Sequence, residues 1–309
     1  MNPNPALRRF LVRFILLAVG LPPALATAAE PGADLRTLRH GGLDRHYLVR
    51  VPEHAPGARL PVVLVLHGGG GHAENIEATT GFTALAKREG FIAVYPEGTG
   101  RFAHRMLAWN AVHCCGPAMT QQVDDAGFIR ALLDRLAADL PVDPRRVYAT
   151  GLSNGGMMTH RLGIALSDRL AAIAPVAATV FGDEPAPASP VAALMVNGAL
   201  DVSVPPAGGP PGGRFREAWD GAPTQPALAQ GAFWAKANGC DATPERAVTG
   251  TLTRWRYRCA AGRDVELLLV ADQGHAWPGG ERGSRLGDAP SRTVQATELI
   301  WQFFKQQSK

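Results

Sequence analysis

The sequence feature that most constrains the fold is an apolar stretch at residues 147–150 that leads into Gly151-Leu-Ser-Asn-Gly155 and then into a helix-forming segment. Gly151 and Gly155 have no side chains, so the backbone beside Ser153 can turn sharply and expose the serine hydroxyl above the edge of a sheet. This strand–turn–helix pattern predicts a nucleophile elbow. An ordinary helix N-cap is the alternative role for such a serine, and the rest of the sequence has to decide between the two roles.

Apolar stretches typical of buried strands alternate with helix-like segments along most of the chain. We expect strands at residues 47–51, 60–66, 91–95, 171–175, 192–196 and 265–271, and helices at residues 79–89, 123–140, 225–238 and 292–305. Strands that are continuously apolar and separated by helices are typical of a mostly parallel sheet covered by helices on both faces. The pattern therefore predicts an α/β fold with one catalytic domain over residues 27–309.

The first 26 residues have the features of an export signal. Three arginines precede an apolar run at residues 14–21, and Ala24-Leu-Ala26 has the small residues of a cleavage site. We predict a signal peptide over residues 1–26, with cleavage after Ala28 or Ala29 as the alternative. The protein is then secreted or periplasmic. We expect no stable membrane anchor, because the apolar run is too short to span a bilayer and prolines follow it.

The charge pattern argues against a nucleic-acid partner. The formal net charge of the chain is +4, and the three arginines of the predicted signal peptide contribute most of it. The other basic residues are scattered among acidic ones, without the basic run or interleaved aromatic residues that nucleic-acid binding favours. The sequence gives no indication of an oligomeric state.

Four cysteines remain in the predicted mature chain, and an exported protein is expected to form disulfides. Cys240 and Cys259 flank a strand-like segment, and a bridge between them would stabilise the fold by about 3 kcal/mol. Cys114 and Cys115 are adjacent, so they could bond to each other, stay reduced or pair elsewhere. Adjacent thiolates are poorly spaced to chelate one ion, and we expect no metal site there.

The acid and the base that a serine nucleophile requires are present in a suitable order. A serine hydroxyl becomes reactive when an imidazole takes its proton, and a carboxylate must orient that imidazole. In α/β-hydrolases the acid and then the histidine follow the serine, each after a later strand. Asp201 follows the expected strand at 192–196, and His275 follows the one at 265–271. Asp272 is a rival acid, but it is so close to His275 in sequence that we expect it to shape the loop instead.

A glycine run supplies candidates for an oxyanion hole. His67-Gly-Gly-Gly-Gly71 follows an expected central strand, and backbone amides there can approach a substrate closely. We predict that the amides of Gly69 and Asn154 form the hole. Phosphate binding is the alternative, but no Lys-Ser/Thr pair or dinucleotide motif follows the run. Trp109 and Trp277 are candidates for lining the substrate pocket, and packing in the core or at the rim is the alternative for both.

Together these residues resemble the polyhydroxybutyrate depolymerase-like esterases, which are related to the feruloyl and acetylxylan esterases of carbohydrate esterase family 1. The resemblance covers roughly residues 44–304, and its motifs include Trp109-Asn-Ala-Val-His-Cys-Cys-Gly116, Asp143-Pro-Arg-Arg-Val-Tyr148, Gly151-Leu-Ser-Asn-Gly-Gly-Met157 and Gly274-His-Ala-Trp-Pro-Gly-Gly280. It implies an α/β-hydrolase fold with Ser153 as nucleophile, Asp201 as acid and His275 as base. Asn197-Gly-Ala-Leu-Asp201 departs from the His-Gly that usually precedes the acid in this family.

The resemblance also implies a function. We expect a secreted serine carboxylic-ester hydrolase that acts through an acyl-enzyme and needs no cofactor. Hydroxyalkanoate oligomers or similar small or oligomeric esters are the expected substrates, and feruloyl or acetylxylan esters of plant cell walls are the alternative. An exported binding protein that keeps the fold without catalysis is the alternative of a different class.

Overall fold

A computed structural model describes Met1, residues 35–214 and residues 216–309 of the protein. The predicted signal peptide therefore lies, apart from Met1, outside the described residues. By its internal contacts the chain from Asp34 to Lys309 forms one unit. None of the helices over the described residues has the length and apolar character that crossing a bilayer requires.

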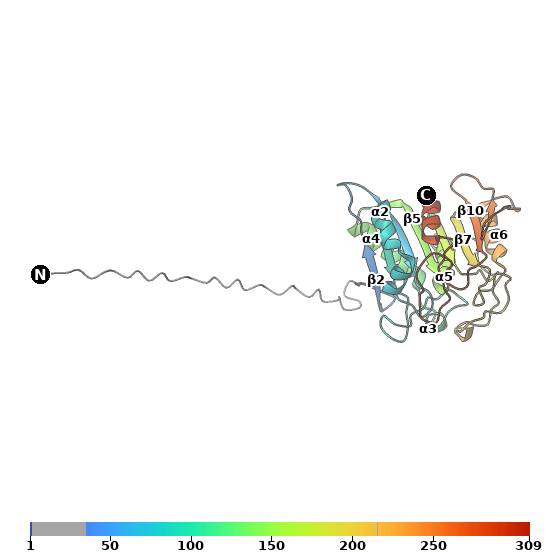
Figure 1. The fold of residues 1–309 in the computed structure, drawn as a ribbon, viewed down its shortest axis with the longest axis horizontal. Coiled ribbons are helices and arrows are strands. Elements are labelled where there is room, and N and C mark those ends of the chain that lie inside the picture. Colours follow the sequence, from blue (N-terminus) through green and yellow to red (C-terminus); the bar gives the residue numbers. More distant parts are fainter. Residues whose placement is uncertain (2–34, 215) are drawn as a thin grey trace. The chain divides into compact units, whose positions relative to one another are not determined.

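In the described part of the chain, ten strands form one mixed sheet (Figure 1). Its order is β1-β2-β4-β3-β5-β6-β7-β10-β9-β8. The strands are β1 Arg36–His40, β2 Leu43–Arg50, β3 Leu60–Leu66, β4 Ile92–Pro96, β5 Val142–Leu152, β6 Ala172–Val176, β7 Ala192–Gly198, β8 Glu245–Thr249, β9 Leu252–Tyr257 and β10 Val265–Val270. In this order, the neighbouring strands of the central part β4-β3-β5-β6-β7-β10 pair in parallel. The hairpins β1–β2 and β9–β8 join its two edges with antiparallel pairing. The prediction of a mostly parallel sheet is confirmed.

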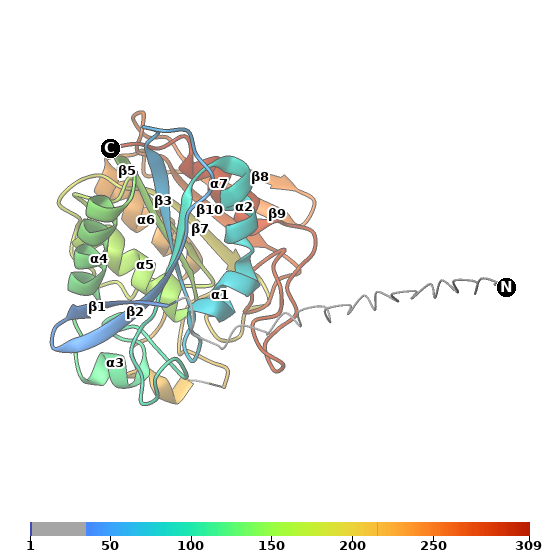
Figure 2. The same ribbon diagram turned by 90° about the vertical axis from the view of Figure 1, so that its left-hand side faces the viewer.

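Helices cover both faces of the sheet (Figure 2). They are α1 Ala73–Thr80, α2 Phe82–Glu89, α3 Gly116–Thr120, α4 Asp125–Asp139, α5 Asn154–Ala165, α6 Ala227–Asn238 and α7 Ala296–Phe304, with a short 3₁₀ turn at Arg216–Ala218. Successive side chains of a strand point to opposite faces. Val62 and Leu64 of β3 accordingly join the core under α4, α5 and α6, while Val63 and Val65 join the core under α1, α2 and α7.

The single helix expected over residues 79–89 is in fact two helices. Gly81 lies between them with a φ of +69°, and its N–H donates to the carbonyl of Glu77, which ends α1. This left-handed conformation favours glycine and commonly ends helices. The first of the two helices, α1, begins at Ala73, one residue after the glycine run, so its first turn lies close to the predicted oxyanion loop in sequence.

Candidate active site

Ser153 lies at the junction of β5 and α5, in a backbone conformation that only a tight turn produces. Its φ is 56° and its ψ is −122°, a combination that non-glycine residues rarely adopt. The two neighbouring glycines are needed for steric reasons. A Cβ atom on Gly151 would lie 2.5 Å from the Gly155 carbonyl oxygen, and one on Gly155 would lie 2.5 Å from the Leu66 carbonyl oxygen. Close packing of β3, β5 and α5 therefore holds the strained serine in place.

The structure brings the three predicted catalytic side chains into one hydrogen-bonded chain. Ser153 Oγ lies 2.8 Å from His275 Nε2, and His275 Nδ1 lies 2.8 Å from Asp201 Oδ2. The second oxygen of Asp201 accepts the N–H groups of Ser203 at 2.8 Å and Val204 at 2.9 Å. Asp201 is buried, whereas the His275 ring remains partly exposed. The acid is thus fixed on both oxygens, and the imidazole is reachable from solvent.

This geometry determines which nitrogen of His275 carries the proton. A carboxylate only accepts, so the proton lies on Nδ1 when His275 is neutral. The lone pair on Nε2 then faces the hydroxyl of Ser153. An imidazole in this state can take the serine proton and later return it to a leaving group.

Two further aspartates lie in the His275 loop and have different partners. Asp272, the rival acid, accepts the hydroxyl of Ser291 at 2.9 Å and that of Thr293 at 3.1 Å, and so shapes the loop. Asp288 accepts the backbone N–H of His275 at 2.6 Å. The sequence does not indicate Asp288, because this residue lies outside every strand and motif and reaches His275 only through the fold of the loop.

The glycine run presents free backbone amides next to Ser153. Gly70 N–H donates to Leu107 O at 2.7 Å, and Gly71 N–H donates to Gly68 O at 3.0 Å. Among the residues that the structure describes, the Gly68 and Gly69 amides have no such partner. A Cβ on Gly69 would lie 3.7 Å from Asn154 Cβ, so Gly69 is next to the first residue of α5. The N–H of that residue has no acceptor within its own helix.

His67 connects the glycine run to Gly98 through its two ring nitrogens. Its Nδ1 lies 2.8 Å from Gly68 O and therefore donates, while its Nε2 accepts the Gly98 N–H at 3.0 Å. Burial lowers the pKa of His67 to about 4. The ring is therefore neutral at physiological pH, as its two hydrogen bonds require, and His67 serves to position the loop.

Both candidate pocket tryptophans lie in the core. Trp109 and Trp277 are fully buried, and their indole N–H groups donate to His67 O and to Thr297 Oγ1. Neither indole presents surface to a substrate in this conformation, which favours the packing alternative. The backbone of Trp109 is nevertheless tied to the site. Its N–H donates to Asn154 Oδ1 at 2.7 Å, and its carbonyl accepts Asn154 Nδ2 at 3.0 Å.

Exposed apolar side chains lie instead in the loops around the triad. Leu200 and Val202 are 61% and 66% exposed and flank Asp201. Met106 is also exposed, and its side chain lies beside Gly70 of the glycine run. The sequence does not indicate these residues, because single apolar side chains in loops produce no periodic pattern.

His113 joins three loops. Its Nδ1 lies 2.7 Å from Asp220 Oδ2, its Nε2 lies 2.9 Å from Asp183 Oδ2, and its ring centre lies 4.7 Å from that of Phe181. Burial disfavours the charged imidazole, but the hydrogen bonds and charges of the two aspartates outweigh burial and raise the pKa of His113.

All four cysteines lie among the described residues and form two disulfides, Cys114–Cys115 and Cys240–Cys259. The second bridge joins the residue after the C-cap of α6 to the segment that follows β9. The first lies next to the site, since Cys114 Sγ is 3.6 Å from Asn154 Nδ2. The structure therefore pairs each cysteine with the cysteine next to it in chain order.

A parallel sheet with helices on both faces and a serine at a strand–helix elbow define this protein as an α/β-hydrolase. Residues 45–205 match the family model described as Esterase PHB depolymerase, and the chain belongs to this family. It is a carboxylic-ester hydrolase.

Similarities to known proteins support membership of this family. The chain is 32% identical over 278 residues to NocK of Nocardia uniformis subsp. tsuyamanensis, whose name assigns it provisionally to the esterases; the match covers 81% of this chain and 77% of NocK. It is 30% identical over 248 residues to feruloyl esterase B of Piromyces equi, covering 77% of this chain but 44% of the fungal protein. The acetyl xylan esterase of Aspergillus awamori has the same fold, with a TM-score of 0.56 at 14% identity over 78% of this chain and 94% of that structure.

Proposed function

We propose that this protein is a serine esterase that hydrolyses its substrate through an acyl-enzyme. Ser153 is the nucleophile, His275 the general base and then the general acid, and Asp201 the residue that orients His275. The observation that carries the proposal is the unbroken chain from Ser153 Oγ through the imidazole to Asp201, with both links at 2.8 Å. Such a chain supplies what a weak hydroxyl nucleophile needs.

In the first half of the reaction, Ser153 Oγ attacks the ester carbonyl carbon while His275 Nε2 takes its proton. The carbonyl oxygen becomes negatively charged, and the amides of Gly69 and Asn154 are the donors that stabilise it. His275 then gives its proton to the departing alcohol oxygen. In the second half, His275 takes a proton from water while the water oxygen attacks the acyl carbon. His275 then returns this proton to Ser153 Oγ as the bond between Oγ and the acyl carbon breaks and the acid product leaves.

The proposed substrates are hydroxyalkanoate oligomers or similar esters. Membership of the PHB depolymerase esterase family supports this choice. Leu200, Val202 and Met106 provide apolar contacts for the substrate in the loops beside the triad. Feruloyl or acetylxylan esters are the second candidate, favoured by the similarity to a feruloyl esterase of Piromyces equi.

We also propose that residues 27–309 are exported as one catalytic domain after removal of residues 1–26, to the periplasm or the medium. The two disulfides support this location, because such bonds persist in oxidising compartments.

Replacement of the nucleophile tests the mechanism. Ser153→Ala should reduce turnover of p-nitrophenyl acetate by at least about 10³-fold, with an unchanged circular dichroism spectrum. Ser284→Ala, at an exposed serine later in the loop that contains His275, is the control and should keep full activity. A fluorophosphonate should label the wild type and the control but not Ser153→Ala. Activity or labelling that survives in Ser153→Ala would show that another residue is the nucleophile, and an unlabelled wild type would favour the non-catalytic binding protein.

A substrate panel tests the second part of the proposal. Catalytic efficiencies for 3-hydroxybutyrate oligomers, methyl ferulate and acetylated xylan should rank the hydroxybutyrate oligomers first. A higher efficiency with methyl ferulate or acetylated xylan would replace the first substrate class by the second.

A further inference from the structure

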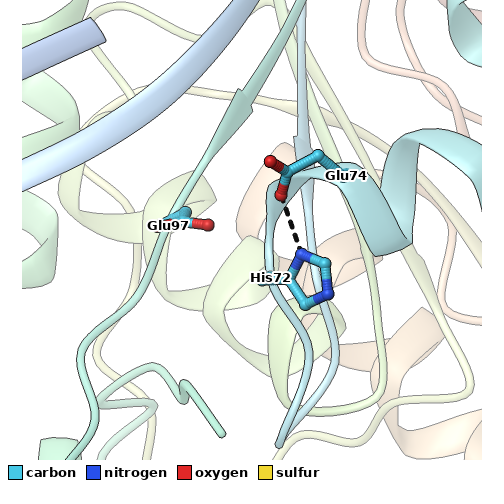
Figure 3. A group of neighbouring side chains, drawn as sticks. All are labelled: His72, Glu74 and Glu97. Carbon is cyan, nitrogen blue, oxygen red and sulfur yellow. Dashed lines mark hydrogen bonds and ion pairs between the residues drawn. The ribbon is translucent and has the colours of Figure 1, made fainter. Parts of the chain in front are cut away.

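Metal-ligating side chains gather where β4 ends and α1 begins. His72, Glu74 and Glu97 each offer one ligand atom, and these atoms lie within 4.8 Å of one another (Figure 3). His72 and Glu74 belong to the start of α1, whereas Glu97 directly follows β4. Figure 3 shows that the side chain of Glu97 points across toward the His72–Glu74 pair. His104 extends the group, since its Nδ1 lies 2.7 Å from Glu97 Oε2.

We propose that His72, Glu74 and Glu97 bind one divalent transition-metal ion, Zn²⁺. Imidazole nitrogens and carboxylate oxygens together are a donor set that Zn²⁺ accepts in a tetrahedral arrangement. Ligand atoms of such an ion lie about 3.4 Å apart, given bonds of about 2.1 Å. The group therefore needs side-chain movements of about 1 Å to close around the ion, which rotation of the part-exposed His72 and Glu74 can provide.

Burial and charge fit a cation at this place. Glu97 is only 1% exposed, and its carboxylate accepts the Ala73 N–H at 3.2 Å as well as contacting His104. A buried carboxylate is costly unless positive charge lies close to it. A divalent ion would supply such charge. His72, Glu74 and His104 are each about one-third exposed, so the ion can enter from solvent.

A metal ion at this site would restrain the glycine run at both of its ends. His72 directly follows the glycine run, and Glu97 precedes Gly98, whose N–H donates to His67 Nε2. One ion bonded to His72 and Glu97 would therefore link the end of the run to the segment that fixes its beginning. The role assigned to the ion is structural, and its binding does not depend on the proposed esterase mechanism.

Titration of the chelator-treated mature protein with ZnCl₂ tests the site. Calorimetry should find one strongly bound Zn²⁺ per chain. The thermal midpoint should rise by about 5 °C when free Zn²⁺ is about a hundredfold above its dissociation constant. His72→Ala and Glu74→Gln change part-exposed positions and leave the buried Glu97 in place, so both variants should fold and should each weaken binding by at least about tenfold.

His54→Gln is the matched control, because this imidazole bonds the nearby Pro52 carbonyl and lies outside the group. It should bind Zn²⁺ as the wild type does. Unchanged affinity in both His72→Ala and Glu74→Gln would overturn the proposal, as would a wild type that gains no thermal stability from Zn²⁺. Ca²⁺ titrated in parallel should bind more weakly than Zn²⁺, and the reverse order would refute the assignment to a transition metal.

Discussion

The proposed role of Asp201 can be tested by exchanging one oxygen for an NH₂ group, in Asp201→Asn. Oδ1 of Asp201 accepts the N–H groups of Ser203 and Val204. In the variant, the amide oxygen has to take this position, because an NH₂ group cannot accept from them. The NH₂ group therefore faces His275 Nδ1, at the 2.8 Å that now separates Nδ1 from the carboxylate.

A donor in this place reverses the tautomer of His275. Nδ1 has to accept, so the ring proton moves to Nε2 and points at Ser153 Oγ. The imidazole can then no longer take the serine proton, and the carboxylate that stabilises the charged ring is absent as well. A loss of about 10⁴-fold in kcat is the size expected for this error, or about 5.4 kcal/mol at about 1.36 kcal/mol per factor of ten.

The assay is steady-state hydrolysis of p-nitrophenyl acetate, together with thermal unfolding. KM should stay within about threefold of the wild type and the fold should be intact, because the amide has the shape of the carboxylate and keeps its two N–H partners. Asp272→Asn is the control in the His275 loop and should retain kcat within about tenfold, since its carboxylate bonds Ser291 and Thr293. The reasoning fails if Asp201→Asn keeps more than about a tenth of the activity, or if Asp272→Asn loses as much.

Three further changes probe the elbow, a loop junction and a disulfide. Gly155→Ala should destabilise the fold by more than about 3 kcal/mol in urea unfolding, because its Cβ would lie 2.5 Å from a carbonyl oxygen of β3. The control Gly69→Ala, whose Cβ would have its nearest contact at 3.7 Å, should lose less than about 1 kcal/mol. Equal losses of stability in the two variants would refute the steric argument. Since the folded pKa of His113 is raised above its ordinary 6.5, His113 stabilises the wild type fully below pH 6.5 and progressively less as the pH rises through the raised value. The difference in unfolding free energy between wild type and His113→Gln should therefore shrink from pH 6.5 upward, and a difference that is independent of pH would count against the two-aspartate contact. The double variant Cys240→Ser/Cys259→Ser should lose about 3 kcal/mol, the loop-closure entropy of a bridge that spans 19 residues, and a loss below about 1 kcal/mol would contradict this account.

The sequence predicts the central strands well, because a parallel strand buried on both faces is a continuous apolar run. The two outermost strands, β1 and β8, are not predicted from the sequence. All residues of β8, Glu245–Thr249, are exposed, and β1, Arg36–His40, is mostly exposed, so neither has an apolar pattern to recognise. The break at Gly81 also escapes prediction, since one glycine within a helix-like pattern does not show whether the helix continues or ends there.

The triad residues follow from strand positions, because each lies just after a parallel strand whose carboxyl end reaches the same edge of the sheet. Asp288 and His113 act through contacts between loops that are distant in sequence, and no local spacing encodes such contacts. Trp109 and Trp277 show the opposite problem. Their neighbours in sequence belong to the site, but both indoles turn into the core, and side-chain depth is set by packing that a linear motif does not contain.

The contacts of Asn154 connect one of the proposed oxyanion donors to the loop that contains His113. Its backbone amide is one of the two proposed oxyanion donors, while its side chain bonds both the N–H and the carbonyl of Trp109. Trp109 begins the loop that contains His113, and His113 joins that loop to Asp183 and Asp220 of two other loops. A displacement of these loops would therefore be transmitted through these hydrogen bonds to the residue after Ser153. Because oxyanion donors must be placed within a few tenths of an ångström to be effective, substitutions in these loops should change kcat as well as KM.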